Sequence, residues 1–405
     1  MTQVFDPQRL DRVRQWAEAL VADEKLPSAG ILIWHAGQEQ LAHFCGYQRI
    51  EDHTPFGRET VARIYSMTKP VTSVGIMQFV ERGLLALDTR IDQIIPAFGN
   101  MKALAPGATS LSDQMPARAP TVHELLVHTS GLSYSFNEGL LPKAMATSRL
   151  GFGPKASGLE AQVEKLAQLP LAFEPGTQWE YSVGIDVAGH ILEVLSGQPL
   201  EAYFQEHIFA PLGMHDTSFA VRPDQLSRFS DLYMPSHAQD SFVSGRVVQA
   251  GLKRVERAER SHYQDPDTYS GGGGLVGTID DYMRFVEALR RLGQGENGRI
   301  LAPATVAFML QNHLPGDISD LGPKSFSEEP TTGMGFGLGG AVVTSPARMQ
   351  VPGNVGDFSW GGMASTCFWL DPTLDLSVVF FTQLTPSSAY AIRPQLKALV
   401  HAALA

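Results

Sequence analysis

The sequence predicts an α/β protein of the α+β type, in which an antiparallel β-sheet is flanked by helices and carries an inserted, mainly helical subdomain. Near the N-terminus, strand-like runs at 28–35 and 40–47 are joined by a short polar turn, which is typical of a β-hairpin. Near the C-terminus, runs at 365–370 and 376–384 flank a second turn, and a helix is expected over 389–404. Both ends of the sequence therefore supply sheet and covering helix.

The chain between these two ends has a different pattern. From 87 to 290 the sequence is mainly helical, with long loops rich in Gly, Pro and Ser. A chain of 405 residues exceeds the usual limit of a single hydrophobic core, so an inserted unit is expected. We predict a discontinuous sheet-and-helix domain, 1–86 and 291–405, and a helical insert, 87–290, whose long loops wall a substrate pocket.

The composition excludes several classes of function. The formal net charge is −11 and the basic residues are scattered, whereas nucleic-acid binding needs a basic stripe. No segment approaches the roughly 18 uninterrupted apolar residues of a membrane span. The segment 1–22 resembles an amphipathic helix and lacks an export signal, so we expect a cytoplasmic protein. For the same reason Cys45 and Cys367 are expected to be buried free thiols rather than a disulfide.

The first indication of chemistry is the tetrapeptide Ser66-Met67-Thr68-Lys69, the only Ser-x-x-Lys of the chain. Side chains three residues apart share one face of a helix, so the Ser66 hydroxyl and the Lys69 amine are expected within hydrogen-bond reach, as a nucleophile and its base. Pro70 fits the first turn of a helix, where no backbone N–H is needed. Ser66 then lies at the helix mouth, where free N–H groups and the macrodipole stabilise an oxyanion and a neutral lysine. The alternative is a tetrapeptide that occurs by chance.

A second segment places Tyr181 where a loop passes into the helix-like run 185–196. Its phenol relays protons to a nucleophile only if a cation such as Lys69 holds it partly ionised, so the two residues would work as a unit. The structural alternative is a tyrosine that caps the helix.

A third segment, Trp360-Gly361-Gly362-Met363, precedes the strand-like run 365–370. Paired glycines at a strand edge let a ligand approach the backbone, and the Met363 N–H is then a second oxyanion donor beside that of Ser66. A β-bulge or a tight turn explains the same glycines equally well.

With these three clusters in this order, the chain resembles the serine β-lactamase and penicillin-recognising enzyme superfamily, whose signatures include Ser-x-x-Lys. In particular it is similar to the class C-like (family VIII) carboxylesterases and to related acyltransferases. The resemblance implies a β-lactamase/transpeptidase-like fold, with Lys69 and Tyr181 as general base and acid and the backbone amides of Ser66 and Met363 as the oxyanion hole. We expect this chemistry to need no metal and no cofactor. Further segments that resemble the family are 126–132, 173–176, 271–275 and 368–372.

Two departures from the family pattern bear on the substrate. Where Tyr-x-Asn is usual, Val183 offers no amide to pair with a substrate amide. Where Lys-Thr-Gly is usual, Trp360-Gly361-Gly362 lacks the cation that attracts a substrate carboxylate, and losing such a charge-assisted bond costs about 1.5–3 kcal/mol. Both changes favour neutral esters of small apolar acyl groups. Tyr134 and Trp360 are candidate walls of the acyl pocket, because aromatic side chains suit apolar substrates.

Three other patterns are rejected. His123 and His128 are five residues apart and fall on different helix faces, so they do not make a His-Glu-x-x-His zinc site. Instead, His128 is expected to make a structural hydrogen bond in the turn that follows it. The glycines of 335–340 precede a strand, which excludes a dinucleotide fingerprint and favours a glycine-rich edge strand. Gly271–Gly274 lack the Lys-Ser/Thr of a phosphate loop.

We predict a serine hydrolase that cleaves carboxylic esters through an acyl-enzyme on Ser66, with a small-molecule ester as its partner and neither nucleic acid nor membrane. The same nucleophile also suits a β-lactamase, a D,D-peptidase or an acyltransferase. A non-catalytic binding protein that retains the fold is a rival of another class. The natural ester, acyl length, stereochemical preference and oligomeric state do not follow from the sequence.

Overall fold

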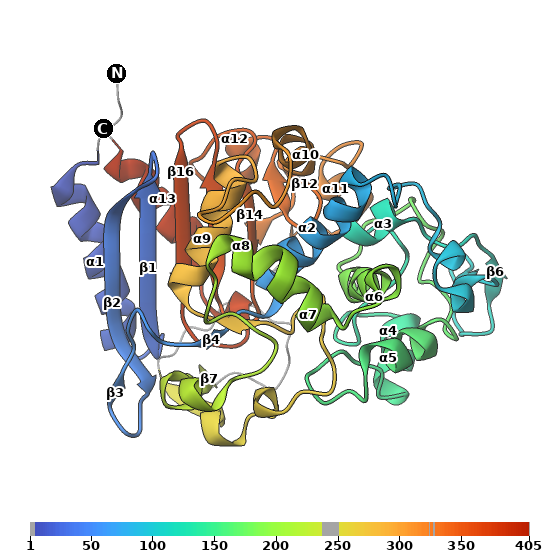
Figure 1. Ribbon diagram of the computed structural model, residues 1–405, viewed down its shortest axis with the longest axis horizontal. Helices are drawn as coiled ribbons and strands as arrows, with labels where there is room; N and C mark the ends of the chain where they lie inside the picture. The colour runs from blue at the N-terminus through green and yellow to red at the C-terminus, as the bar shows by residue number, and fades with distance from the viewer. Residues whose placement is uncertain (1–4, 237–250, 324, 327–328, 405) are drawn as a thin grey trace.

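The computed structural model of the chain describes residues 5–236, 251–323, 325–326 and 329–404 (Figure 1). Within these residues an eight-stranded antiparallel sheet has the order β12-β13-β14-β15-β16-β1-β2-β3. Strands from both ends of the chain form this one sheet and helices cover its faces, so the predicted fold class is confirmed. The strands are β1 (Ser28–His35), β2 (Gln38–Arg49), β3 (Thr54–Pro55), β12 (Met334–Phe336), β13 (Ala341–Val343), β14 (Phe358–Gly361), β15 (Cys367–Asp371) and β16 (Leu376–Phe381).

The two expected hairpins lie next to each other in this sheet. β1 pairs with β2 on one side and with β16 on the other, and β16 pairs with β15. The glycine-rich segment 335–340 begins in β12, which is an edge strand as predicted. Trp360 and Gly361 lie inside β14, so the glycine pair straddles the end of one strand and the turn into the next rather than preceding a single strand.

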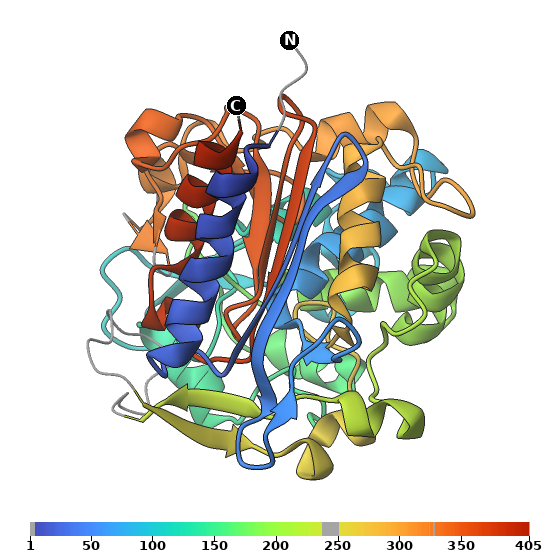
Figure 2. The ribbon, with the colours of Figure 1, turned by 90° about the vertical axis from the view of Figure 1, so that its left-hand side faces the viewer.

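Helices cover both faces of the sheet (Figure 2). α1 (Pro7–Ala22) and α13 (Ile392–Ala403) lie against each other on one face, and α9 (Ile279–Arg290) packs on β15, β16 and β1 from the other. Ile31 and Ile33 of β1 point into the core between the sheet and the pair α1 and α13. Leu32 points into the core on the opposite face, beneath α9. Central strands are therefore apolar on both sides, as a doubly covered sheet requires.

Helix α2 (Thr68–Glu81) belongs to the core on the α9 side of the sheet and packs against α6 (Gly184–Ser196).

No helix of the described ranges is both long enough and apolar enough to cross a membrane. The division into a sheet domain and a helical insert stays a prediction. The other helices are α3 (Val122–Leu126), α4 (Leu140–Thr147), α5 (Leu159–Leu166), α7 (Leu200–Phe204), α8 (Ala210–Leu212), α10 (Pro303–Met309), α11 (Ile318–Leu321) and α12 (Pro346–Met349). The two-stranded pairs are β4 (Ala62–Arg63) with β9 (Val276–Gly277), β5 (Lys102–Leu104) with β6 (Gln114–Pro116), β7 (Leu232–Pro235) with β8 (Leu252–Glu256), and β10 (Ser325–Phe326) with β11 (Glu329–Pro330).

Both cysteines are free thiols, as predicted. Cys367 is buried in β15, whereas Cys45, in β2 near the edge of the sheet, is only partly buried against the core beneath α1 and α13. The expectation that both would be buried was therefore wrong for Cys45. Even partial burial raises the pKa of the Cys45 thiol to about 11, which makes it a poor nucleophile.

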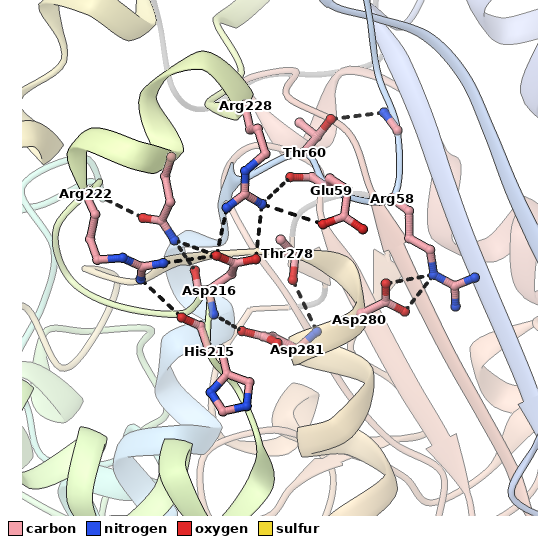
Figure 3. A network of polar contacts seen from close by, with 12 residues as sticks. Arg58, Glu59, Thr60, His215, Asp216, Arg222, Arg228, Thr278, Asp280 and Asp281 are labelled. Atoms are coloured by element: carbon pink, nitrogen blue, oxygen red, sulfur yellow. Dashed lines mark hydrogen bonds and ion pairs between the residues drawn. The ribbon is translucent and has the colours of Figure 1, made fainter.

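A network of ion pairs fixes the N-terminal end of α9 (Figure 3). The Asp216 carboxylate accepts hydrogen bonds from Arg222 and Arg228 at 2.9–3.1 Å, and its backbone N–H donates to Asp281 of α9 at 2.7 Å. Asp281 in turn donates its own N–H to the Thr278 side chain, which caps the helix. The hydrogen bond from Arg228, above all, lowers the pKa of Asp216 to about 2.

We expect Asp216→Asn to lower the free energy of unfolding by about 1–2 kcal/mol at neutral pH, because two arginines lose their charged partner. A carboxyl with a lowered folded-state pKa stabilises the fold above its unfolded value of about 3.9 and loses that effect as the pH falls towards its folded value. The gap between wild type and variant should therefore narrow below about pH 4. Urea unfolding at neutral and acidic pH measures it, with the exposed Asp224→Asn as the matched control. A constant gap would contradict the assignment.

Candidate active site

Ser66 lies in a single 3-10 turn (Tyr65–Met67) that leads directly into α2. The preceding residue, Tyr65, has a φ of +43°, a left-handed conformation that costs a non-glycine residue about 1–3 kcal/mol and clusters at functional sites. Pro70 occupies the first turn of α2, as predicted. The turn therefore presents the Ser66 hydroxyl at the positive end of the helix dipole.

The Lys69 side chain is completely buried, one helical turn beyond Ser66. Its Nζ atom lies 3.3 Å from Ser66 Oγ, 2.8 Å from the Tyr134 hydroxyl and 2.7 Å from the carbonyl oxygen of Gly272. The spacing in the sequence therefore brings the hydroxyl and the amine together, as expected for a nucleophile and its base.

Tyr181 reaches the same serine from another part of the chain. Its hydroxyl donates a hydrogen bond to Ser66 Oγ at 2.6 Å, and Lys69 Nζ lies 4.6 Å from the centre of its ring. Tyr181 ends the loop before α6, whose N-cap is Val183. The three residues predicted to act together thus converge on one oxygen atom, Ser66 Oγ.

Tyr134 has a role that the sequence did not indicate. It lines the cavity, as expected, but its hydroxyl also accepts a hydrogen bond from Lys69. Burial, followed by the nearby Tyr181 and Asp186, raises the pKa of Tyr134 well above its usual value, so it stays a neutral phenol. Its only signal in the sequence was a tyrosine in a loop, because no local pattern connects positions 65 residues apart.

His128 differs from the prediction. Its Nδ1 atom lies 3.2 Å from Ser182 Oγ and 3.3 Å from the Ser182 backbone nitrogen, so its hydrogen bond holds the loop of Tyr181 and not the turn after His128. Burial, above all, lowers the pKa of His128 well below its usual value, so the imidazole is neutral. Its ring packs edge-on against Tyr181, with 4.9 Å between centroids. His123 contacts His313 instead, so the two histidines do not form a metal site together.

The third predicted segment also reaches the site. Trp360, Gly361, Gly362 and Met363 all line the cavity that holds Ser66. A Cβ atom on Gly362 would lie 2.3 Å from the carbonyl oxygen of Ile64, so only glycine allows β14 to approach the chain just before Ser66. The oxyanion hole of the Ser66 and Met363 amides stays a prediction.

The cavity in front of Ser66 has a volume of about 1430 Å³, and aromatic side chains form part of its wall. Phe326 stacks on Trp360 with 5.5 Å between ring centroids, and Tyr181 lies 5.6 Å from Trp360. Aromatic surfaces of this kind favour apolar ligands. The aromatic residues that line it are Tyr65, Tyr134, Phe136, Phe152, Trp179, Tyr181, Tyr263, Phe326 and Trp360.

Potential metal ligands gather elsewhere in the described part of the chain. Ligand atoms of Asp357, Asp371 and His401 lie within 4.8 Å of one another, and none of these residues lines the cavity of Ser66. Lys397 Nζ lies 2.8 Å from Asp357 Oδ2, so an ammonium group already balances part of the carboxylate charge. This cluster ties α13 to the sheet and supplies no group to Ser66.

Comparison with known proteins identifies relatives of this chain. The family model described as Beta-lactamase matches residues 13–402. Esterase EstB of Burkholderia gladioli is 31% identical over 382 residues, which cover 92% of this chain and 89% of the esterase. Monacolin J acid methylbutanoyltransferase of Aspergillus terreus is 29% identical over 364 residues, covering 86% and 83% of the two chains.

Among solved structures, EstCE1 is described as a hydrolase with promiscuous acyltransferase activity. It superposes with a TM-score of 0.78 at 29% identity, over 97% of this chain and 99% of its own. The fold and the sequence therefore point to the same group of relatives.

We expect a fluorophosphonate to label Ser66 and Lys69→Met to slow that labelling by about 10²–10⁴-fold, the usual contribution of a general base. Intact-mass spectrometry with peptide mapping measures the rate and the position of labelling. Ser73→Ala, which removes a buried serine of the same helix, is the control and should label like wild type. Labelling that is equally fast in Lys69→Met would exclude Lys69 as the base.

Proposed function

Because the chain belongs to the beta-lactamase family, we propose that it is a serine carboxylesterase that cleaves esters of small apolar acyl groups through an acyl-enzyme on Ser66. The family is a superfamily of serine enzymes, with esterases and acyltransferases among the relatives of this chain. One observation carries the proposal: Ser66 Oγ lies 2.6 Å from the Tyr181 hydroxyl and 3.3 Å from Lys69 Nζ at the wall of an aromatic cavity.

In the acylation step, neutral Lys69 accepts the Ser66 hydroxyl proton while Oγ attacks the ester carbonyl. The tetrahedral oxyanion is bound by the backbone amides of Ser66 and Met363, beside the positive end of α2. Tyr181 then donates a proton to the leaving alcohol and recovers it from Lys69. The products of this step are the free alcohol and an ester of Ser66.

In the deacylation step, water attacks the Ser66 ester, and the Lys69–Tyr181 pair accepts the water proton. The second tetrahedral intermediate collapses, Ser66 Oγ regains its proton, and the carboxylic acid leaves. Each group therefore returns to its starting protonation state without any bound cofactor.

The preference for neutral esters has support in the surroundings of Ser66. Val183 is buried at the N-cap of α6, and its side chain offers no amide group to a substrate. The Lys69 amine is already hydrogen-bonded to the Tyr134 hydroxyl.

Trp360 presents an indole, with Phe326 stacked on it, where a lysine would attract a substrate carboxylate. The guanidinium of Arg393, which lines the same cavity, is paired with Glu329 at 3.5 Å. Amide and carboxylate recognition both lose a partner, which favours esters over β-lactams and peptides.

We expect p-nitrophenyl esters of short acyl chains to be hydrolysed with a kcat/KM about 10²-fold or more above that of nitrocefin or a D-Ala-D-Ala peptide. Steady-state rates on the three substrate classes measure the difference, and Ser66→Ala is the inactive control. Faster lactam or peptide turnover would replace the esterase assignment. Ester hydrolysis that survives in Ser66→Ala would remove the proposed nucleophile.

Acyl transfer is the second candidate, favoured by the size of the cavity. Its volume of about 1430 Å³ exceeds the ~300–1,000 Å³ of ordinary ligand pockets, so an acyl chain and an acceptor alcohol fit together. EstCE1 is described as having promiscuous acyltransferase activity, which supports acyl transfer as a reaction of this chain.

We expect added alcohols to divert the acyl group from water, because the acceptor binds in the cavity while Ser66 carries the ester. Chromatography of the new ester against the free acid, at increasing alcohol concentration, measures the partition. A partition that rises with the apolar size of the alcohol supports transfer. A partition that follows only the molar ratio of alcohol to water would leave hydrolysis as the reaction.

A further inference from the structure

The glycine run Gly271–Gly274, which is no phosphate loop, packs directly on the helix that carries Lys69. Thr72 of α2 donates a hydrogen bond to the Gly271 carbonyl at 2.6 Å, and the Leu275 N–H donates to Thr68 Oγ1 at 3.1 Å. A Cβ atom on Gly271 would lie 2.7 Å from the carbonyl oxygen of Ile185 in α6, so glycine is needed for the loop to fit between the two helices. The backbone of the glycine run therefore lies next to the helix segment that carries Lys69.

Asp186 in the first turn of α6 holds this loop. The carboxyl group is completely buried, and its Oδ1 atom accepts hydrogen bonds from the Gly272 N–H at 3.0 Å and from the Ser270 hydroxyl. A Cβ atom on Gly272 would lie 2.3 Å from Asp186 Oδ2. Gly272 is thus bound on both sides: its N–H donates to Asp186, and its carbonyl accepts from Lys69 at 2.7 Å.

Asp186 also acts on the second partner of Lys69. Its negative charge raises the pKa of the Tyr134 phenol, after burial and the neighbouring Tyr181. The Oδ2 atom of Asp186 is buried and has no hydrogen-bond partner among the described residues. Both oxygen atoms that lie nearest to Lys69 Nζ, the Gly272 carbonyl and the Tyr134 hydroxyl, therefore belong to groups that interact with Asp186.

We propose that Asp186 is a positioning residue that fixes the direction of the Lys69 amine through Gly272 and Tyr134. A neutral amine has two N–H groups and one lone pair. If the two N–H groups point to the Gly272 carbonyl and the Tyr134 oxygen, the lone pair faces Ser66 Oγ, where a general base must accept the proton. Asp186 favours this arrangement electrostatically, because its negative charge near the phenol orients the Tyr134 O–H group with its hydrogen toward Asp186 and leaves the oxygen lone pairs for Lys69. The inference rests on the proposed function for its meaning in catalysis.

Two variants of Asp186 test the proposal, with the rate of fluorophosphonate labelling and the kcat/KM for a p-nitrophenyl ester as readouts. We expect Asp186→Ala to lower both by about tenfold to a hundredfold with little change in KM, because a misdirected amine slows acylation without weakening binding. Asp186→Asn keeps the shape of the side chain and removes its charge, so it decides the question if Asp186→Ala does not fold.

The pH profile separates positioning from general stability. Burial raises the pKa of Asp186, against the opposing effect of Lys69, so this carboxyl takes up a proton on the acid side, while Tyr134 and His128 in the same cluster stay uncharged. Asp186→Asn removes that titration and should therefore move the acid limb of kcat/KM to lower pH. The matched control is Asp281→Asn, another buried aspartate on the N-terminal turn of a helix (Figure 3). It should lower the melting temperature and leave the position of the acid limb unchanged.

The outcomes are distinct from those of the proposed function. An acylation rate in Asp186→Asn within about threefold of wild type, or an acid limb that stays in place, overturns the positioning role. If wild type labels at Ser66 but hydrolyses no ester, the esterase assignment fails, and the labelling rates of the variants with their pH dependence still decide the role of Asp186. If wild type does not label at all, both proposals fall.

Discussion

The complete burial of the Lys69 amine is the constraint on which the rest of the site depends. An amine without access to water must find all its hydrogen-bond partners inside the protein, since an unpaired buried polar group costs about 1–3 kcal/mol or more. Its partners are uncharged oxygen atoms from a serine, a tyrosine and a backbone carbonyl, which come from widely separated segments. The fold is therefore required to bring a helix, a loop and a glycine run to one point.

Helix α2 meets this constraint because it is enclosed on all sides. Every residue from Thr68 to Phe79 is buried. The Thr72 hydroxyl donates to Gly271 of the glycine run, and the Thr68 hydroxyl accepts from Leu275, which follows the run. The left-handed conformation of Tyr65 turns the chain into this helix, and the surrounding contacts bear its strain. A helix that is fixed along its whole length holds the Ser66 hydroxyl and the Lys69 amine in one geometry, which proximity catalysis requires.

The parts of this arrangement that follow from local patterns were predictable from the sequence. The hairpins, the edge strand, the placement of Pro70 and the approach of Ser66 to Lys69 depend on residues close in the chain. The hydrogen bond from Lys69 to Gly272 spans 203 residues, and the one between His128 and Ser182 spans 54. No periodicity or turn signal records such pairs, so the partners of His128, the second role of Tyr134 and the position of Asp186 emerged only from the packed structure.

The aromatic residues around Ser66 connect substrate preference to catalysis. Tyr181 contacts His128, Tyr134, Phe326 and Trp360, all with 4.9–5.6 Å between ring centroids. Two of these, Phe326 and Trp360, also stack on each other and line the cavity, so one aromatic cluster both lines the cavity and packs around the Tyr181 phenol. In the proposed esterase, a substitution that reshapes this wall for another acyl chain would therefore also shift the hydroxyl that donates to Ser66 Oγ. Acyl selectivity and rate would then depend on one packed cluster and would not vary independently.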